Sequence, residues 1–380
     1  MSEARITNLS NESNTGGPTI SGITTFSGTN YFVPPVGSTA ERPENPEKGS
    51  IRFNTDSKHL EYFRGDSIGW VDVEASYGQV GGGTGSNTGT GARGFQSGYH
   101  VYGDTIEYIT ISTLGNSQDF GNLSTGRFNT GNQVGNENRM LFAGGYYVNV
   151  IDYWSVQSLG NAADFGDLTV PRQSMSGLND KIRGVWAGGQ GPSHAQQNAM
   201  DYVTIQSTGN AVDFGDLNNA TKVHSAVCSS TRGIWCAVTS YPLAGDLQYV
   251  NIRTTGNTVD FGTLGSGLNW QSGGGSSATR GMFSGGYIAN NITYVTMATT
   301  GDSVDFGDTT TRRYYYSNMT SPTRCVFGAG LTVPSAVKSN VADYCEIATT
   351  GNAVDFGDIA YLTSQGYGGG GSNAHGGVSG

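Results

Sequence analysis

A chain of 380 residues with 60 glycines, 13% charged residues and a net charge of −10 is too poor in charge for a disordered tail. It is also too rich in aliphatic and aromatic residues for a linker, and many short strands joined by glycine-rich turns fit it best. The negative charge argues against nucleic acid and anionic membranes as partners, because both are themselves anionic. No run approaches the roughly 18 apolar residues of a membrane span, and the N-terminus lacks the features of a secretion signal.

Residues 1–78 are expected to form an anchoring or oligomerisation module with an extended N-terminal arm. Alternating runs at Ser50–Phe53, Leu60–Phe63 and Gly69–Val73 predict three short strands. Three such strands bury little apolar surface, so the module is expected to need a partner. The composition of residues 79–91 predicts a flexible linker to a main domain at 92–380.

One phrase recurs six times in the main domain, with DYVTIQSTGNAVDFG at 201–215 as an example. In every copy the tyrosine stands eleven residues before the aspartate of a DFG triplet. The tyrosines are Tyr108, Tyr153, Tyr202, Tyr249, Tyr294 and Tyr344. The aspartates are Asp119, Asp164, Asp213, Asp260, Asp305 and Asp355. A period of 45 to 50 residues in a strand-rich sequence is typical of propeller blades.

Each repeat predicts four strands. The first follows an arginine, the second carries the tyrosine, and the third carries DFG after a Gly-Asn hairpin (Gly-Asp in the fifth repeat). A weaker fourth run, such as Lys222–Cys228, is expected to complete the sheet of its own repeat. The arginines are Arg93, Arg139, Arg183, Arg232, Arg280 and Arg324.

Six complete repeats predict an all-β fold, a six-bladed β-propeller closed into a ring. The distance from a DFG aspartate to the next arginine is 19 or 20 residues, and after the last repeat this count reaches His375. We therefore expect the last repeat to complete its own sheet, with Ala92–Gly98 beside Ser364–Gly376.

The stretch between arginine and tyrosine varies from 14 to 20 residues, whereas the hairpin has a fixed length. The connections of variable length share one face of a propeller, where binding is expected. Its aromatic residues are candidates for stacking on sugars or protein partners, with packing inside their own sheet as the alternative. These candidates are Tyr99, Tyr102, Tyr146, Tyr147, Tyr241, Tyr287, Tyr314, Tyr315 and Tyr316.

The chemistry of the sequence argues against an enzyme. DFG binds Mg²⁺ in kinases, but here it occurs six times without the other kinase motifs, which favours a strand-to-turn role for its aspartate and a packing role for its phenylalanine. Acid pairs such as Asp213 and Asp216 offer too few ligands for Ca²⁺. The five histidines show no zinc spacing, and the cysteines (Cys228, Cys236, Cys325 and Cys345) are expected to be packed thiols made in a reducing cytoplasm. No cofactor and no metal are expected.

The FAGGY run at Phe142–Tyr146 and the FSGGY run at Phe283–Tyr287 resemble the Gly-Gly…Tyr pattern of kelch repeats. The likeness extends from Ala92 onward and implies a kelch-like propeller. It departs from the kelch pattern in two respects: phenylalanine of DFG replaces the kelch tryptophan, and three of the repeats lack the double glycine.

The segment GSIRFNTDSKHLEYFRGDSIGWVDV at Gly49–Val73 is similar to short β modules of tailed-phage fibre and virion structural proteins. The phrase DYVTIxxTGNAxDFGDL is similar to that of repeat-bearing structural proteins of marine phages, cyanophages in particular. Together these resemblances cover most of the chain. They imply a virion protein synthesised in the host cytoplasm and, from the fibre-like module, a homotrimer.

The first hypothesis is therefore a tail-fibre or appendage protein of a tailed phage, bound to other virion proteins through its N-terminal module. Its propeller would bind a host-surface glycan or protein, and many copies would strengthen a weak contact. The second hypothesis is a capsid decoration or cement protein. An intracellular kelch-like adaptor and a propeller enzyme acting on glycans are further alternatives.

Overall fold

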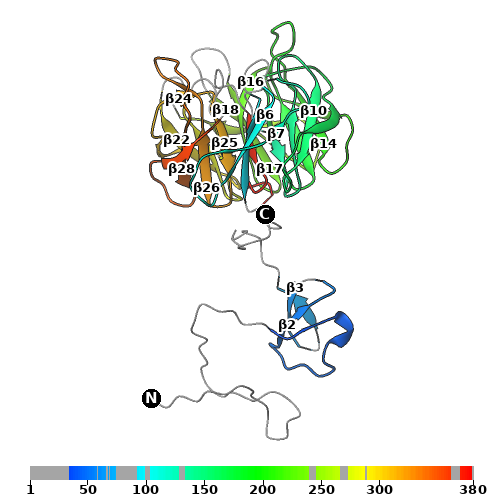
Figure 1. The fold of residues 1–380 in the computed structure, drawn as a ribbon. Helices are drawn as coiled ribbons and strands as arrows, with labels where there is room; N and C mark the ends of the chain where they lie inside the picture. The colour runs from blue at the N-terminus through cyan, green and yellow to red at the C-terminus, as the bar shows by residue number, and fades with distance from the viewer. Residues whose placement is uncertain are drawn as a thin grey trace, which may run out of the picture. The chain divides into compact units, whose positions relative to one another are not determined.

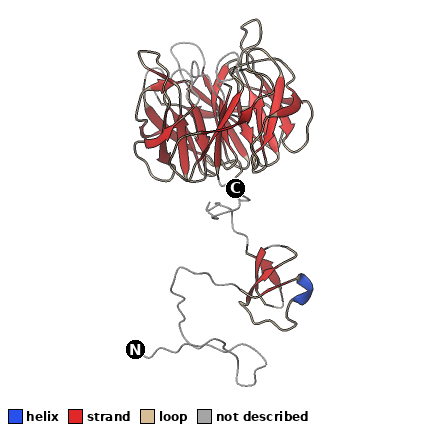
Figure 2. Ribbon diagram, viewed as in Figure 1, coloured by secondary structure: helices blue, strands red, loops and turns tan. Residues whose placement is uncertain are grey.

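The computed structural model describes residues 34–57, 59–65, 67, 69–73, 92–98, 103–127, 133–238, 245–265, 273–286, 289–360 and 369–378. The chain divides into two compact units, Met1–Ala75 and Ser76–Gly380. The described residues of both units form β-strands (Figure 2), and the only helix among them is the short 3-10 helix η1, Thr39–Glu41. None of the described residues lies in a helix long and apolar enough to cross a membrane. The predicted linker at 79–91 lies outside the described residues.

The N-terminal unit contains a four-stranded sheet in the order β1-β2-β3-β4. Its strands β2 and β3 are labelled in Figure 1. The three predicted strands are confirmed to within one residue, and β1 adds a short strand parallel to β2. The bounds are β1 Val36–Gly37, β2 Ile51–Asn54, β3 His59–Phe63 and β4 Trp70–Asp72.

One face of this sheet is buried although it carries charged side chains. The Glu61 carboxylate is fully buried and accepts hydrogen bonds from Arg42 Nε at 3.2 Å and from Asn54 Nδ2 at 3.1 Å. Arg52 approaches the same carboxylate at 3.5 Å and donates to Ser38 O at 3.0 Å. Hydrogen bonds from Arg42 hold the pKa of Glu61 below its ordinary value.

The opposite face of the same sheet is apolar and open. Strand pairing places Val36 beside Phe53, and Ile51 beside Tyr62. Val36 is 57% exposed and Ile51 is 53% exposed, while the remaining side chains of this face are half-buried. We call this surface the apolar module face; its residues are Val36, Ile51, Phe53, Leu60, Tyr62 and Val71. An antiparallel sheet usually turns its polar side to solvent, so the module has the reverse arrangement.

The described part of the C-terminal unit forms six four-stranded antiparallel sheets, numbered here by repeat. Sheet 1 contains β30 (Gly369–Ser372), β5 (Arg93–Ser97), β6 (Thr105–Thr110) and β7 (Gln118–Asn122). Sheet 2 contains β8 (Val134–Gly135), β9 (Arg139–Ala143), β10 (Val150–Ser155) and β11 (Ala163–Asp167). Sheet 3 contains β12 (Ser176–Asn179), β13 (Arg183–Ala187), β14 (Ala199–Thr204) and β15 (Val212–Asp216).

Sheet 4 contains β16 (Lys222–Cys228), β17 (Arg232–Val238), β18 (Gly245–Asn251) and β19 (Val259–Thr263). Sheet 5 contains β20 (Gly273–Ser276), β21 (Arg280–Ser284), β22 (Asn291–Thr296) and β23 (Val304–Asp308). Sheet 6 contains β25 (Ser317–Thr320), β26 (Arg324–Gly328), β28 (Val341–Glu346) and β29 (Val354–Asp358). A small two-stranded sheet pairs β24 (Arg313–Tyr314) with β27 (Leu331–Thr332).

The predicted membership of the fourth strand is wrong. Lys222–Cys228 pairs with β17 of the following repeat rather than with the DFG strand of its own repeat. After each DFG strand the chain crosses to begin the next sheet, so the run after the last DFG completes sheet 1 instead of sheet 6. The predicted neighbourhood of the two chain segments is confirmed, because Gly369 pairs with Ser97 and Ser372 with Gly94.

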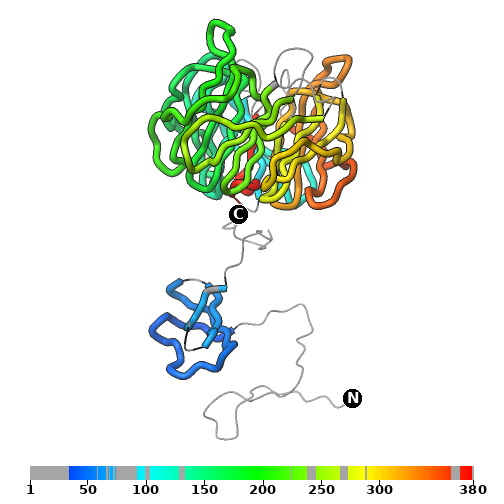
Figure 3. The backbone as a smooth tube through the Cα atoms, turned by 180° about the vertical axis from the view of Figure 1, so that it is seen from behind, coloured from blue at the N-terminus to red at the C-terminus, as the bar shows by residue number. Residues whose placement is uncertain are grey.

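The first strands of the six sheets contact one another in a cyclic order. From β8 the order runs through β12, β16, β20 and β25 to β30, and β30 in turn contacts β8. Glycines allow this close approach: a Cβ on Gly274 would lie 2.5 Å from Ala226 O, and one on Gly370 would lie 2.6 Å from Asn318 O. In Figure 3 the red C-terminal segment lies between the green sheets and the yellow and orange ones.

The last residue of β30 and the residues that follow it contact every one of the six sheets. His375 is the centre of this segment: its Nε2 lies 2.9 Å from Gly135 O, and its Nδ1 lies 3.3 Å from Cys228 Sγ and accepts from Gly377 N at 3.1 Å. The contacts to the six sheets, in order, are Asn373–Arg93, His375–Gly135, Gly377–Asn179, His375–Cys228, Gly376–Ser276 and Ser372–Thr320.

Neighbouring sheets are joined by the Gly-Asn turn of one and the DFG strand of the sheet before it, a contact we call the inter-sheet seam. The turn glycine donates its N–H to the DFG phenylalanine carbonyl at 2.7–3.0 Å. The turn Asn or Asp side chain accepts an N–H from the residue after DFG at 2.8–3.1 Å. The glycine pairs are Gly160–Phe120, Gly209–Phe165, Gly256–Phe214, Gly301–Phe261, Gly351–Phe306 and Gly115–Phe356.

The repeat arginine, tyrosine and phenylalanine also have one role in every sheet. The guanidinium lies 4.4–4.7 Å from the centre of its own tyrosine ring and donates to a carbonyl of the next sheet. The same tyrosine meets the buried DFG phenylalanine edge-on at 5.8–5.9 Å. The predicted packing role of this phenylalanine is confirmed.

The DFG glycine and the turn glycine provide a matched test of the seam. Both have positive φ, +142° at Gly215 and +154° at Gly209. A Cβ on Gly215 would lie 2.4 Å from Gly256 O, whereas a Cβ on Gly209 would have no atom within 4 Å. We expect Gly215→Ala to lower the free energy of unfolding by about 1–3 kcal/mol more than Gly209→Ala, the usual cost of overpacking. Urea unfolding of both variants measures the difference, and equal losses would contradict this role of the seam.

Candidate binding surface

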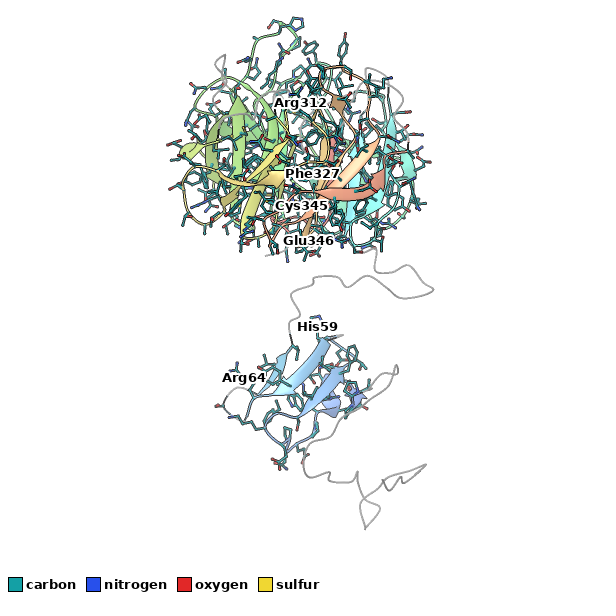
Figure 4. All side chains as sticks on the ribbon, turned by 90° about the vertical axis from the view of Figure 1, so that its left-hand side faces the viewer. His59, Arg64, Arg312, Phe327, Cys345 and Glu346 are labelled. Atoms are coloured by element: carbon teal, nitrogen blue, oxygen red, sulfur yellow. The ribbon has the colours of Figure 1, made fainter. Side chains whose placement is uncertain are left out.

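The loops that connect strands lie at two ends of the C-terminal unit. Figure 4 shows Arg312, in the connection from sheet 5 to sheet 6, at one end and Glu346, at the close of β28, at the other. The Arg312 end carries the connections of variable length, and the Glu346 end carries the Gly-Asn turns. The corrected strand membership leaves this division as the sequence predicted it.

An aromatic patch on the Arg312 end joins the loops of sheets 2 and 3. Tyr146 and Tyr147 follow β9, and His194 lies in the loop after β13. The Tyr146 and Tyr147 ring centres are 5.6 Å apart, and the Tyr147 and His194 ring centres are 5.5 Å apart. Tyr147 Oη lies 2.7 Å from His194 Nδ1, while Tyr146 is 51% exposed. The patch therefore has an open aromatic ring supported by a hydrogen-bonded pair.

All three residues of this patch adopt left-handed backbone conformations. Their φ angles are +37° at Tyr146, +63° at Tyr147 and +61° at His194. Such angles cost free energy for residues with a side chain, and they concentrate at functional sites. Burial and the nearby Tyr146 raise the pKa of Tyr147. Its hydroxyl is thus protonated at neutral pH and can donate to His194 Nδ1.

Arg172 positions the loop that carries the two tyrosines. Its carbonyl accepts from Gly145 N at 3.0 Å, and its N–H donates to Val148 O at 3.3 Å. Its fully buried guanidinium pairs with Asp201 in sheet 3 at 2.7 Å. The aromatic loop therefore rests on a buried ion pair that links two sheets.

This ion pair recurs in two other places that the sequence analysis did not identify. The three pairs are Arg127–Asp152, Arg172–Asp201 and Arg313–Asp343. A signal was present in the sequence: the arginine stands eight residues after a DFG aspartate in repeats 1, 2 and 5, and the residue before the tyrosine of the next repeat is aspartate only after those three. The two positions therefore vary together within one chain.

The other predicted tyrosines differ in their positions. Tyr314 and Tyr315 are half-buried, with ring centres 4.7 Å apart, and form a second aromatic pair between sheets 5 and 6. Tyr316 is only 3% exposed and packs edge-on against Phe327, so it does not belong to a contact surface. The remaining candidates, Tyr99, Tyr102, Tyr241 and Tyr287, lie outside the described residues.

Sequence reasoning missed His194 because a single loop histidine has no diagnostic spacing.

The six DFG aspartates are all exposed on the third strand of their repeats. In the seam the side chain that accepts a backbone N–H belongs to the turn residue rather than to the DFG aspartate, as when Asn210 Oδ1 accepts from Asp167 N. The part of the chain that the structure describes contains no group of three or more His, Cys, Asp or Glu side chains arranged to hold a metal.

Two hollows in the C-terminal unit are less suited to a ligand than the aromatic patch. The first strands enclose a cavity of about 20 Å³ beside Asn318 and His375, which has room for about one water molecule. A groove of about 370 Å³ lies between sheets 5 and 6 at Arg280 and Pro322. The Arg280 guanidinium in this groove already donates a hydrogen bond to Ile347 O at 2.8 Å. The aromatic patch, in contrast, offers the exposed Tyr146 ring beside the Tyr147 hydroxyl and the His194 imidazole.

Comparison with models of protein families finds no match for this chain. Comparison with curated proteins also finds none. The chemistry of the patch itself is therefore the basis for a functional proposal.

The support under the patch can be tested with a substitution that the chain itself suggests. We expect Arg172→Leu to destabilise the protein by about 3–5 kcal/mol, because Asp201 would be left buried and unpaired. Adding Asp201→Thr reproduces the Leu268 and Thr293 combination of repeats 4 and 5 and should restore most of the loss. Urea unfolding measures both steps. A double variant as unstable as the single one would show that the pair is not the cause.

Proposed function

We propose that this protein is a structural protein of a tailed-phage virion, a tail-fibre or appendage component that displays a kelch-like six-bladed propeller for binding the host surface. Support for the propeller comes from six four-stranded sheets whose first strands touch in cyclic order. Support for the virion comes from the resemblance of the repeat phrase and of the N-terminal segment.

The observation that carries the binding role is the aromatic patch of Tyr146, Tyr147 and His194. An exposed tyrosine ring offers a flat apolar surface to the face of a sugar, and adjacent hydroxyl and imidazole groups offer hydrogen bonds to its hydroxyls. The Tyr147–His194 hydrogen bond and the buried Arg172–Asp201 pair hold these groups in place before a ligand arrives, which lowers the entropic cost of binding. A saccharide of the host surface is the ligand class that fits this chemistry.

The N-terminal unit supplies self-association in this proposal. The apolar module face carries no charged side chain, whereas the chain as a whole has a net charge of −10. Contact between copies through this face avoids the like-charge repulsion that contact through charged surfaces would add. Further copies of this chain are therefore the proposed occupant. Several copies together would turn a weak sugar contact into a firm one.

Self-association can be measured with a matched pair of substitutions. We expect the full chain to form oligomers in sedimentation equilibrium at micromolar concentration, and Ile51→Asp to dissociate them by placing a charge on the apolar module face. Ile182→Asp is the control, because Ile182 is 60% exposed in a turn of sheet 3. A monomeric wild-type chain, or equal effects of both substitutions, would contradict the role of the face.

Saccharide binding is tested on arrays of bacterial surface glycans. We expect Tyr146→Ala to weaken retention about tenfold in Kd, about 1.4 kcal/mol, through loss of the stacking ring. Leu159→Ala is the control, because Leu159 is 61% exposed beside the Gly-Asn turn of sheet 2, at the other end of the strands.

The same experiment separates the alternatives. Retention unaffected by Tyr146→Ala would refute the patch as the binding site. No retention of any glycan would favour the decoration hypothesis, and cleavage of a retained glycan would favour the enzyme.

A further inference from the structure

Two cysteines of sheet 6 lie directly opposite each other. Cys325 in β26 and Cys345 in β28 are register partners in an antiparallel ladder. Both are free and buried, and both belong to the core cluster between sheets 5 and 6. Figure 4 shows Phe327 and Cys345 between Arg312 and Glu346.

The pairing geometry fits a disulfide. Residues directly opposite in an antiparallel pair have Cα atoms about 4.5–5.5 Å apart, and disulfides need about 4.4–6.8 Å. Register partners also point to the same face of the sheet, and the shared core cluster is consistent with this. The other two cysteines have no such partner: Cys228 contacts His375, and Cys236 pairs with Ser225 and Leu247.

The repeat shows what usually fills this place. In sheets 3, 4 and 5 the same two positions hold a glycine opposite a valine, as in Gly281 and Val295; the other two pairs are Gly184–Val203 and Gly233–Val250. Sheet 6 replaces this small and large pair with two residues of intermediate size. A glycine and a valine fill the core at these two positions in sheets 3, 4 and 5. The two thiols of sheet 6 can in addition form a covalent bond, which those glycine and valine pairs cannot.

We propose that Cys325 and Cys345 form a disulfide across sheet 6 when the chain folds in the presence of a disulfide oxidant such as oxidised glutathione. The thiolate of one cysteine attacks the glutathione disulfide and releases one glutathione. The second cysteine then attacks the resulting mixed disulfide and releases the other. Overall, the two thiols lose two protons and two electrons, and one oxidised glutathione becomes two reduced molecules.

The oxidation is expected to take place during folding, before sheet 6 has packed. Burial raises the pKa of Cys345 to about 12 and that of Cys325 well above its ordinary value, so neither thiol ionises readily once sheet 6 is packed. Before packing, both thiols are open to the oxidant. The disulfide would link the two ends of the segment between Cys325 and Cys345, which contains β27. Because β27 pairs with β24, the bond would also restrain Tyr314 in β24.

The experiment is refolding of the full chain from urea in a mixture of oxidised and reduced glutathione, followed by alkylation of free thiols and peptide mass spectrometry. We expect a Cys325–Cys345 link with Cys228 and Cys236 alkylated. The urea midpoint of the oxidised chain should exceed that of the reduced chain, and dithiothreitol should reverse the difference. The double variant Cys325→Gly with Cys345→Val, the pattern of sheets 3–5, should show no change of midpoint with oxidation.

Two results would overturn the proposal. One is complete alkylation of all four cysteines in the refolded wild-type chain. The other is a mixture of links in which Cys325–Cys345 does not predominate. The mass measurement needs only the wild-type chain, so failure of the double variant to fold would not affect it.

Discussion

The structure of the C-terminal unit depends on the contact between the Gly-Asn turn of one sheet and the DFG strand of the preceding sheet. The backbone of the turn lies so close to the DFG glycine that a Cβ there would be 2.2–2.6 Å from a carbonyl oxygen in all six cases. Hydrogen bonds from the turn glycine, and to the turn Asn or Asp, fix the same approach each time. The last of these contacts joins sheet 6 to sheet 1 through Gly115 and Phe356. Because these contacts lie at the end of the Gly-Asn turns, the loops at the other end can differ in length and sequence from one repeat to the next.

Those loops are where the chain departs from its repeat. The Arg172–Asp201 pair lies beneath the loop of Tyr146 and Tyr147, and the strained conformations of that loop are thus held by a buried link between two sheets. The junctions from repeat 3 to 4, from repeat 4 to 5 and from repeat 6 to 1 lack the arginine and the aspartate of such a pair. The seams thus recur in all six sheets, whereas the ion pairs beneath the loops differ from repeat to repeat. This is the division between a constant scaffold and variable loops that the proposed function requires.

Much of this architecture could be predicted from the sequence, because a six-fold phrase with constant spacing demands one repeated environment. The arginine, tyrosine and phenylalanine positions and the end that carries the variable loops all followed from that spacing. The fourth strand was assigned to the wrong sheet, since periodicity is unchanged when a strand is moved to the next repeat. His194 could not be found, because its partner Tyr147 lies 47 residues away in the chain. Burial of Tyr316 was also beyond reach, since three consecutive tyrosines look alike in a sequence.

We infer that the seams and the C-terminal segment hold the six sheets as one cooperative unit. Hydrogen exchange of a chain lacking Gly369–Gly380 measures this, because the deletion removes β30 and the residues that contact all six sheets. We expect protection to fall in every sheet together. Full protection of sheets 2 to 5, with loss confined to β5, β6 and β7, would contradict it.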